Sequence, residues 1–122
     1  MCPLDGIRVL DFTTLLPGPL ATLLLADLAT DLAMCDAWLW HVAHLVDSGV
    51  SDFGAEASML KMRASDLAMR VATEAVQLHG GYGYCKDYRV ERLMRDAKIT
   101  QIWEGTNQIH RQIIGRSFIL KG

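Results

Sequence analysis

"GAEASMLKMRASDLAMRVATEAVQLH", residues 54–79, decides the fold, because its apolar side chains recur at the spacing of one helix face. That stripe consists of Ala57, Leu60, Ala64, Leu67, Val71, Ala75 and Leu78. A methionine-rich second apolar edge runs beside it, and a polar stripe predicts ion pairs of Arg70 with Asp66 and with Glu74. We expect one long helix over this segment, in contact with two neighbours.

Helix-stopping sequences bound this segment on both sides. Upstream, apolar residues recur with helical spacing over residues 20–47, until "DSG" ends the pattern. Downstream, Gly80 and Gly81 can adopt the positive φ that terminates helices. A further short helix is predicted for "VERLMRDA" at residues 90–97.

The C-terminal part predicts a linking segment and a last helix. Residues 98–105 lack helical periodicity, and Thr106 has the side chain and position of a helix N-cap. The apolar positions of the helix that would follow are Ile109, Ile113, Ile114 and Phe118. Glu104 therefore lies at a junction, directly before a glycine and a helix start.

Residues 1–19 differ from the rest of the chain. "IRVLDF" at residues 7–12 has the composition of a short strand, and "PGP" at residues 17–19 that of a turn. The predicted fold class is all-α, an up-down helical bundle over residues 20–122 with a short non-helical N-terminal segment. The bundle is thin. Residues 20–47 are apolar on most sides, so another helix or a partner subunit should bury them.

The composition excludes several classes of function and site. With 122 residues, 51% hydrophobic, 21% charged and a net charge of -2, the chain has the profile of one soluble globular domain. Basic residues are interleaved with acidic ones, which argues against nucleic acid as a partner. Cys2, Cys35 and Cys85 show neither disulfide nor zinc spacing, and His41 and His44 lack a third ligand, so no metal is predicted. Neither a signal peptide nor a membrane span is predicted, and the cytoplasm or a soluble organelle matrix is the expected location.

Three motifs carry a resemblance to a known family. "AVQLHGGYGY" at residues 75–84, "VERLMRDAKI" at 90–99 and "IWEGTNQIHR" at 102–111 agree in order and spacing with the C-terminal helical domain of the acyl-CoA dehydrogenases. Residues 26–122 resemble that domain. The resemblance implies FAD-dependent α,β-dehydrogenation of an acyl-CoA thioester. It also implies homo-oligomers or docking to other subunits, and the electron-transfer flavoprotein as a partner.

Glu104 is the catalytic base that this resemblance implies, removing the α-proton while the β-hydrogen leaves as hydride to the flavin. A carboxylate can act on so weak an acid only if desolvation raises its pKa, and Trp103 and Ile102 are expected to supply the dry wall. The following helix N-terminus favours the ionised form and opposes that shift. Without the motifs, an acid that stabilises the helix dipole would be the preferred explanation of the position, and the motifs favour the catalytic one.

Cofactor and substrate contacts are implied in the same way. The resemblance places residues 77–81 against the flavin cofactor of a neighbouring subunit; these residues are Gln77, Leu78, His79, Gly80 and Gly81. It also places Thr106, Asn107 and Gln108 on FAD, and Gly105 against the acyl-CoA. Glycines and helix N-termini present backbone N–H groups, which suits phosphate. An ordinary helix cap is the alternative for the two glycines at residues 80 and 81.

The first residues point to another family. "PLDGIRVLDFTTLLPGPLATLLLADL", residues 3–28, resembles the opening of the class III CoA-transferases, and no transferase site residue is carried over. The change of resemblance at residues 25–29 predicts a chimeric or truncated acyl-CoA dehydrogenase that lacks the other domains of the flavin pocket. Two alternatives stay open: a non-enzymatic helical fragment that associates through an uncovered face, and a CoA-transferase relative.

Overall fold

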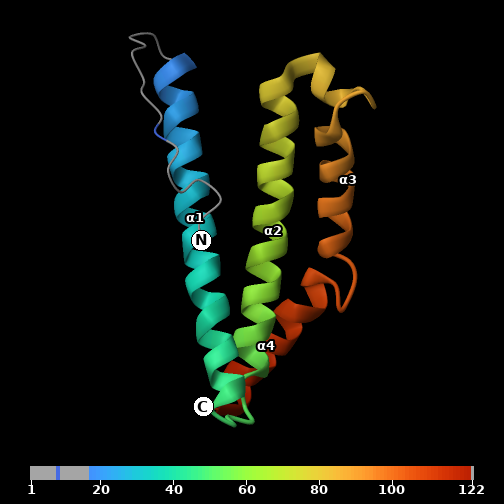
Figure 1. The fold of residues 1–122 in the computed structure, drawn as a ribbon. Helices are drawn as coiled ribbons and strands as arrows, with labels where there is room; N and C mark the ends of the chain where they lie inside the picture. The colour runs from blue at the N-terminus through green and yellow to red at the C-terminus, as the bar shows by residue number, and fades with distance from the viewer. Residues whose placement is uncertain (1–7, 9–16, 122) are drawn as a thin grey trace.

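A computed structural model describes residue 8 and residues 17–121 of the chain (Figure 1). Four α-helices follow one another, α1 (Pro17–Asp47), α2 (Gly54–His79), α3 (Arg89–Thr100) and α4 (Asn107–Lys121), with a short 3-10 helix η1 (Gly80–Tyr84) after α2. No strand occurs in the described part, so the predicted all-α fold is confirmed. Most of the predicted strand at residues 7–12 lies outside the described residues.

Helix α2 is the centre of the arrangement. It contacts α1, α3 and α4, whereas α1 packs on α2 alone among the described elements. Figure 1 shows α1, α2 and α3 side by side, with α4 crossing α2 near the α1–α2 turn. Leu28 and Cys35 of α1 meet Leu67 of α2 in a small buried cluster. The segment predicted to touch two neighbours therefore touches three helices, because its methionine-rich and polar sides are used as well.

Helix α1 is covered on one side only. Trp40 is 71% exposed, and Leu23 and Leu39 are also exposed. Within the described residues α2 covers one side of this helix, which is apolar on most sides, so the predicted burial by a partner subunit stays a prediction. Asp31 adds a polar contact between the two helices, and its carboxylate oxygens lie 2.7 Å from Arg63 Nη2 and 3.1 Å from Arg70 Nη1.

Two predicted boundaries need correction. Helix α1 already begins at Pro17, where a turn was predicted over residues 17–19. A proline in the first turn costs no hydrogen bond, because the N–H groups there have no intrahelical acceptor. Helix α3 extends to Thr100, so residues 98–100 of the predicted link are helical. The helix end after residue 79 is confirmed, and Gly80, with φ 61°, supplies the positive φ.

Candidate functional site

The loop between α3 and α4 carries the predicted base. The N–H groups of Ile102 and Trp103 both donate to the Ile99 carbonyl, at 2.9 and 3.0 Å, and thereby continue the end of α3 as a turn. At the start of α4 the N–H of Ile109 donates to Thr106 Oγ1 at 3.3 Å. Thr106 is therefore the N-cap that the sequence predicted, and Glu104 lies between two helix ends.

Glu104 has a left-handed backbone. Its φ is 52°, and it is the one residue other than glycine with a positive φ among the described residues. Such a conformation costs about 1–2 kcal/mol for a residue with a side chain, so the surrounding contacts must impose it. Gly105 follows with φ 97°, and a Cβ at this position would lie 3.0 Å from His110 Nε2. The shape of the loop thus requires glycine at residue 105, whereas it does not favour glutamate at residue 104.

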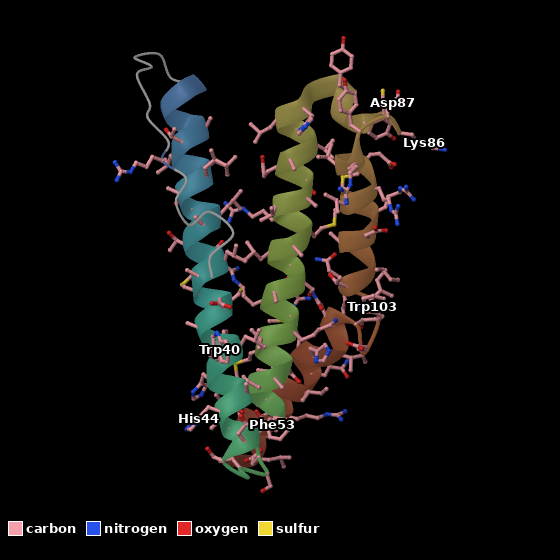
Figure 2. The ribbon with its side chains drawn as sticks, in the orientation of Figure 1. Trp40, His44, Phe53, Lys86, Asp87 and Trp103 are labelled. Carbon is pink, nitrogen blue, oxygen red and sulfur yellow. The ribbon has the colours of Figure 1, made fainter. Side chains whose placement is uncertain are left out.

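The side chain of Glu104 is exposed and borders a cavity of about 250 Å³. The other residues around this cavity are Lys61, Ala64, Ser65, Ala68, Thr100 and Trp103. Trp103 is 53% exposed and lies at the outer edge of the loop (Figure 2). The prediction that Trp103 and Ile102 form a dry wall around the carboxylate is wrong for this chain alone, because the loop has α2 on one side and solvent on the other.

Asn107 joins this loop to α2. Its side chain is 3% exposed, and its Nδ2 donates to Asp66 Oδ1 at 2.8 Å and to Ser65 Oγ at 2.9 Å. Lys61 Nζ donates to Asn107 Oδ1 at 3.0 Å. Gln101 Nε2 donates to the same Asp66 oxygen at 2.6 Å. The Asn107 amide, predicted to touch FAD, therefore has its polar atoms engaged by α2.

Sequence reasoning missed the contribution of α2 to this loop. Asp66 was assigned to an ion pair with Arg70, but Arg70 bonds Asp31 of α1, and Asp66 bonds the α3–α4 loop. Lys61 received no role. A usable signal existed, since residues 61, 65 and 66 interrupt the apolar pattern of α2 with polar side chains on one side of the helix.

A second cavity, of about 310 Å³, lies at the start of α4. It is lined by Asp66, Lys98, Gln101, Ile102, Thr106, Asn107, Gln108 and Arg111. Lys98 and Arg111 are cationic, and among the first N–H groups of α4 that of Gln108 has no acceptor in the described part of the chain, whereas those of Asn107, Ile109 and His110 do. This donor set fits an anionic, acceptor-rich group such as the phosphates of a flavin nucleotide. Of the three residues predicted to touch FAD here, Gln108 has an exposed side chain.

The other predicted cofactor segment, residues 77–81, lies at the opposite end of α3 from Glu104 (Figure 1). Helix α3 has 12 residues, and at about 1.5 Å per residue it spans about 18 Å. The five residues are exposed, and a Cβ added at Gly80 or Gly81 would meet nothing within 4 Å. One chain thus brings Glu104, Gly105 and Thr106 together, but not residues 77–81.

Neither a metal centre nor a membrane span emerges from the described residues. No three His, Cys, Asp or Glu side chains in residues 17–121 are grouped closely enough to hold a metal ion. None of the four helices, as far as described, has both the length and the apolarity to cross a membrane.

Comparison with known proteins agrees with the three motifs. A family model described as acyl-CoA dehydrogenase, C-terminal domain, matches residues 8–119. An acyl-CoA dehydrogenase of Bacillus subtilis is 53% identical over 98 residues, which are 80% of this chain and 25% of that protein. Cyclohexane-1-carbonyl-CoA dehydrogenase of Geobacter metallireducens is 47% identical over 96 residues, 79% of this chain and 25% of its own length.

Solved structures show the same similarity. Butyryl-CoA dehydrogenase of Megasphaera elsdenii matches with a TM-score of 0.79 and 40% identity, over 92% of this chain and 29% of that one. A structure of the electron transferring flavoprotein of Acidaminococcus fermentans contains a chain that matches with a TM-score of 0.77 and 45% identity, over 82% of this chain and 26% of the other. This chain therefore spans about a quarter of the length of the relatives that it matches.

The family match begins at residue 8, earlier than the predicted residue 26, and so includes most of the segment that resembles the CoA-transferases. The transferase resemblance is not supported by these comparisons and stays a prediction. The family match, the relatives' identities and the shared fold lead to one conclusion: the chain belongs to the acyl-CoA dehydrogenase family and corresponds to its C-terminal helical domain.

Proposed function

We propose that this chain contributes part of the active site for an FAD-dependent α,β-dehydrogenation of an acyl-CoA thioester, with Glu104 as the base. The observation that carries the proposal is the left-handed backbone of Glu104, with φ 52°, at the edge of a cavity. A strained non-glycine residue in the loop between two helices is typical of a functional position. A glutamate that only stabilised the α4 dipole would not require that backbone.

The proposed chemistry uses two groups of Glu104. Its carboxylate and its backbone N–H have no hydrogen-bond partner within the described part of the chain. The carboxylate removes the proton from the α-carbon, and the N–H donates to the thioester oxygen, where negative charge develops. Bound FAD would supply the acceptor for the β-hydrogen, which leaves as hydride.

The residues proposed to hold FAD are at the start of α4. Thr106 and Gln108, with Lys98 and Arg111 beside them, line the larger polar cavity and present donors to an anionic cofactor. Asn107 supports this site indirectly, because α2 engages its side chain and its N–H donates to the Gln101 carbonyl. Gly105, without a side chain, leaves room for the acyl-CoA.

Residues 77–81 are proposed to contact the cofactor of a second subunit. Their distance from Glu104 along α3 supports this, as does their exposure. We propose the electron-transfer flavoprotein as electron acceptor, because the chain resembles one in a structure of such a flavoprotein. Cys35 and Cys85 are free thiols, which agrees with a reducing compartment such as the cytoplasm or an organelle matrix.

The test mixes the purified chain with FAD and butyryl-CoA and measures reduction of the FAD by the loss of flavin absorbance. Glu104→Gln should lower the rate at least about a hundredfold, the usual effect of losing a general base, with an unchanged helical circular-dichroism spectrum. Glu74→Gln is the matched control: it makes the same change on α2, away from the loop, and should leave the rate unchanged. Unimpaired reduction by Glu104→Gln would remove Glu104 from the mechanism.

A second candidate function rests on the exposed apolar side of α1, which includes Trp40 at 71% exposure. It is the non-enzymatic helical fragment that docks on another subunit. A wild-type chain that binds no FAD and oxidises no acyl-CoA, but forms a defined larger complex by size measurement, would favour this function over the first.

A further inference from the structure

The left-handed backbone before α4 is held by a lysine from α2. Lys61 Nζ donates to the carbonyl oxygen of Gly105 at 2.7 Å and to Asn107 Oδ1 at 3.0 Å. We propose that Lys61 is a positioning residue for Glu104: its ammonium group fixes the Gly105–Thr106 peptide, and through Gly105 it sets where the Glu104 carboxylate lies. This inference rests on the proposed function, in which Glu104 is the base.

The loop is held at both ends, and Glu104 lies between the two attachments. At the first end, Gln101 Nε2 donates to Asp66 Oδ1 at 2.6 Å. At the second, Lys61 bonds Gly105 and Asn107, and the Asn107 N–H closes the loop by donating to the Gln101 carbonyl at 3.1 Å. Residues 101 and 107 are thereby joined to each other and to α2, while Glu104 itself makes no hydrogen bond with the described residues.

Among the α2 residues that bond this loop, Lys61 makes the contact nearest to the left-handed backbone of Glu104. Asp66 and Ser65 bond side chains at the ends of the loop, whereas Lys61 bonds the backbone oxygen of the residue after Glu104. Both acceptors of Lys61 are neutral oxygens, so its ammonium group does not serve an ion pair in these contacts. Hydrogen bonds from a charged donor are stronger than those between neutral groups, as holding a strained backbone requires.

Lys61 also borders the cavity of Glu104, with Ala64 and Ala68 one and two turns further along α2. Small side chains at these two positions leave room for the loop to approach the helix. The lysine stem can therefore lie along α2 and place Nζ under the Gly105 carbonyl. An apolar side chain at residue 61 would leave that carbonyl without its donor, whereas Asn107 Oδ1 would keep the bond from Ser65 Oγ at 3.1 Å.

The first measurement is hydrogen exchange of the chain without cofactor, read by mass spectrometry on a peptide that covers residues 101–110. Lys61→Met keeps the length of the side chain and removes its donors. It should speed exchange of the Asn107 N–H about tenfold to a hundredfold, the effect expected from losing bonds to a charged donor. Peptides from the first half of α3 should exchange as in the wild type.

Two further variants test whether loss of the cationic donor at residue 61 is the cause of faster exchange. Lys86→Met makes the same substitution at an exposed lysine in the turn before α3, far from Trp103 (Figure 2). This variant should leave the exchange rates of residues 101–110 unchanged. Lys61→Arg keeps a cationic donor and should restore most of the protection. If Lys61→Met loses protection in every helix, the variant is unfolded and Lys61→Arg is used for the test instead. Loss of protection in residues 101–110 of a Lys61→Arg chain that is otherwise folded would overturn the proposal.

The second measurement applies to the flavin-loaded chain with butyryl-CoA. Lys61→Met should lower kcat about tenfold or more and leave KM and FAD affinity within about twofold, because a displaced base slows proton removal more than binding. Lys61→Arg should recover kcat. Equal kcat in wild type and Lys61→Met, or unchanged exchange in residues 101–110, would overturn the positioning role. A wild type that reduces no FAD would contradict the proposed function instead, and the exchange measurement would still decide whether Lys61 holds the loop.

Discussion

Gly105→Ala is the substitution that tests most directly whether the loop before α4 has the shape described. Gly105 has φ 97°, where an alanine costs about 1–2 kcal/mol, and the added Cβ would lie 3.0 Å from His110 Nε2. His110 is 9% exposed, so its ring has little room to move, and overpacking of this kind costs about 1–3 kcal/mol. Alanine also restricts the unfolded chain, which returns about 0.5–1 kcal/mol. The net expectation is a loss of about 2 kcal/mol in the free energy of unfolding.

The assay is urea unfolding followed by circular dichroism, with Gly115→Ala as the matched control. Gly115 lies within α4 with nothing within 4 Å of an added Cβ, so the same substitution there should stabilise the chain by about 0.5–1 kcal/mol. Adding His110→Ala to Gly105→Ala should recover the part of the loss due to the contact and leave the part due to φ. A Gly105→Ala chain as stable as the wild type would refute the left-handed loop, and a loss unaffected by His110→Ala would refute the contact.

Three further predictions follow from packing and burial. Gly83→Ala should destabilise the chain by about 3 kcal/mol in the same assay, because its Cβ would lie 2.6 Å from His79 Cβ and 2.7 Å from the Val76 carbonyl oxygen. Gly81→Ala, where an added Cβ meets nothing within 4 Å, should change stability by less than about 0.5 kcal/mol. Asn107→Ala should cost about 3 kcal/mol, since it removes the hydrogen bonds that a buried amide makes with Lys61, Ser65 and Asp66; a loss below about 1 kcal/mol would contradict that network. Burial raises the pKa of the Cys35 thiol above that of an ordinary cysteine, against a smaller lowering by Arg63. Iodoacetamide at neutral pH should therefore modify the exposed Cys85 faster than Cys35, and peptide mass spectrometry showing equal rates at these two thiols would contradict the burial.

Several features of the fold follow from local sequence alone. The bounds of α2, residues 54–79, agree with the prediction, because an apolar stripe and a glycine stop are properties of neighbouring residues. The N-cap at Thr106 was also predictable, since capping involves only the first turn of a helix. The boundary at residue 98 was wrong, because α3 continues through a segment without an apolar stripe, and a solvent-facing helix end needs none.

Contacts between helices were not predictable in the same way. Lys61, Ser65 and Asp66 bond residues 35 to 46 positions away, and the choice of partner depends on how α3 and α4 lie on α2. Asp66 illustrates this: its sequence neighbours offered Arg70, yet the fold brings Gln101 and Asn107 closer. Exposure of α1 is likewise decided by which helices are present to cover it, and the sequence of α1 itself indicates only that it is apolar on most sides.

For this protein, the sequence by itself determined the helical class, the extent of the central helix, the family and the identity of the candidate base, because periodicity, capping and motif spacing are local. Only the tertiary structure decided that Glu104 has a left-handed backbone, that Lys61 bonds the next residue, and that residues 77–81 lie far from both. The physical reason is that a backbone angle in a loop and a hydrogen bond between two helices are set by the relative placement of elements distant along the chain.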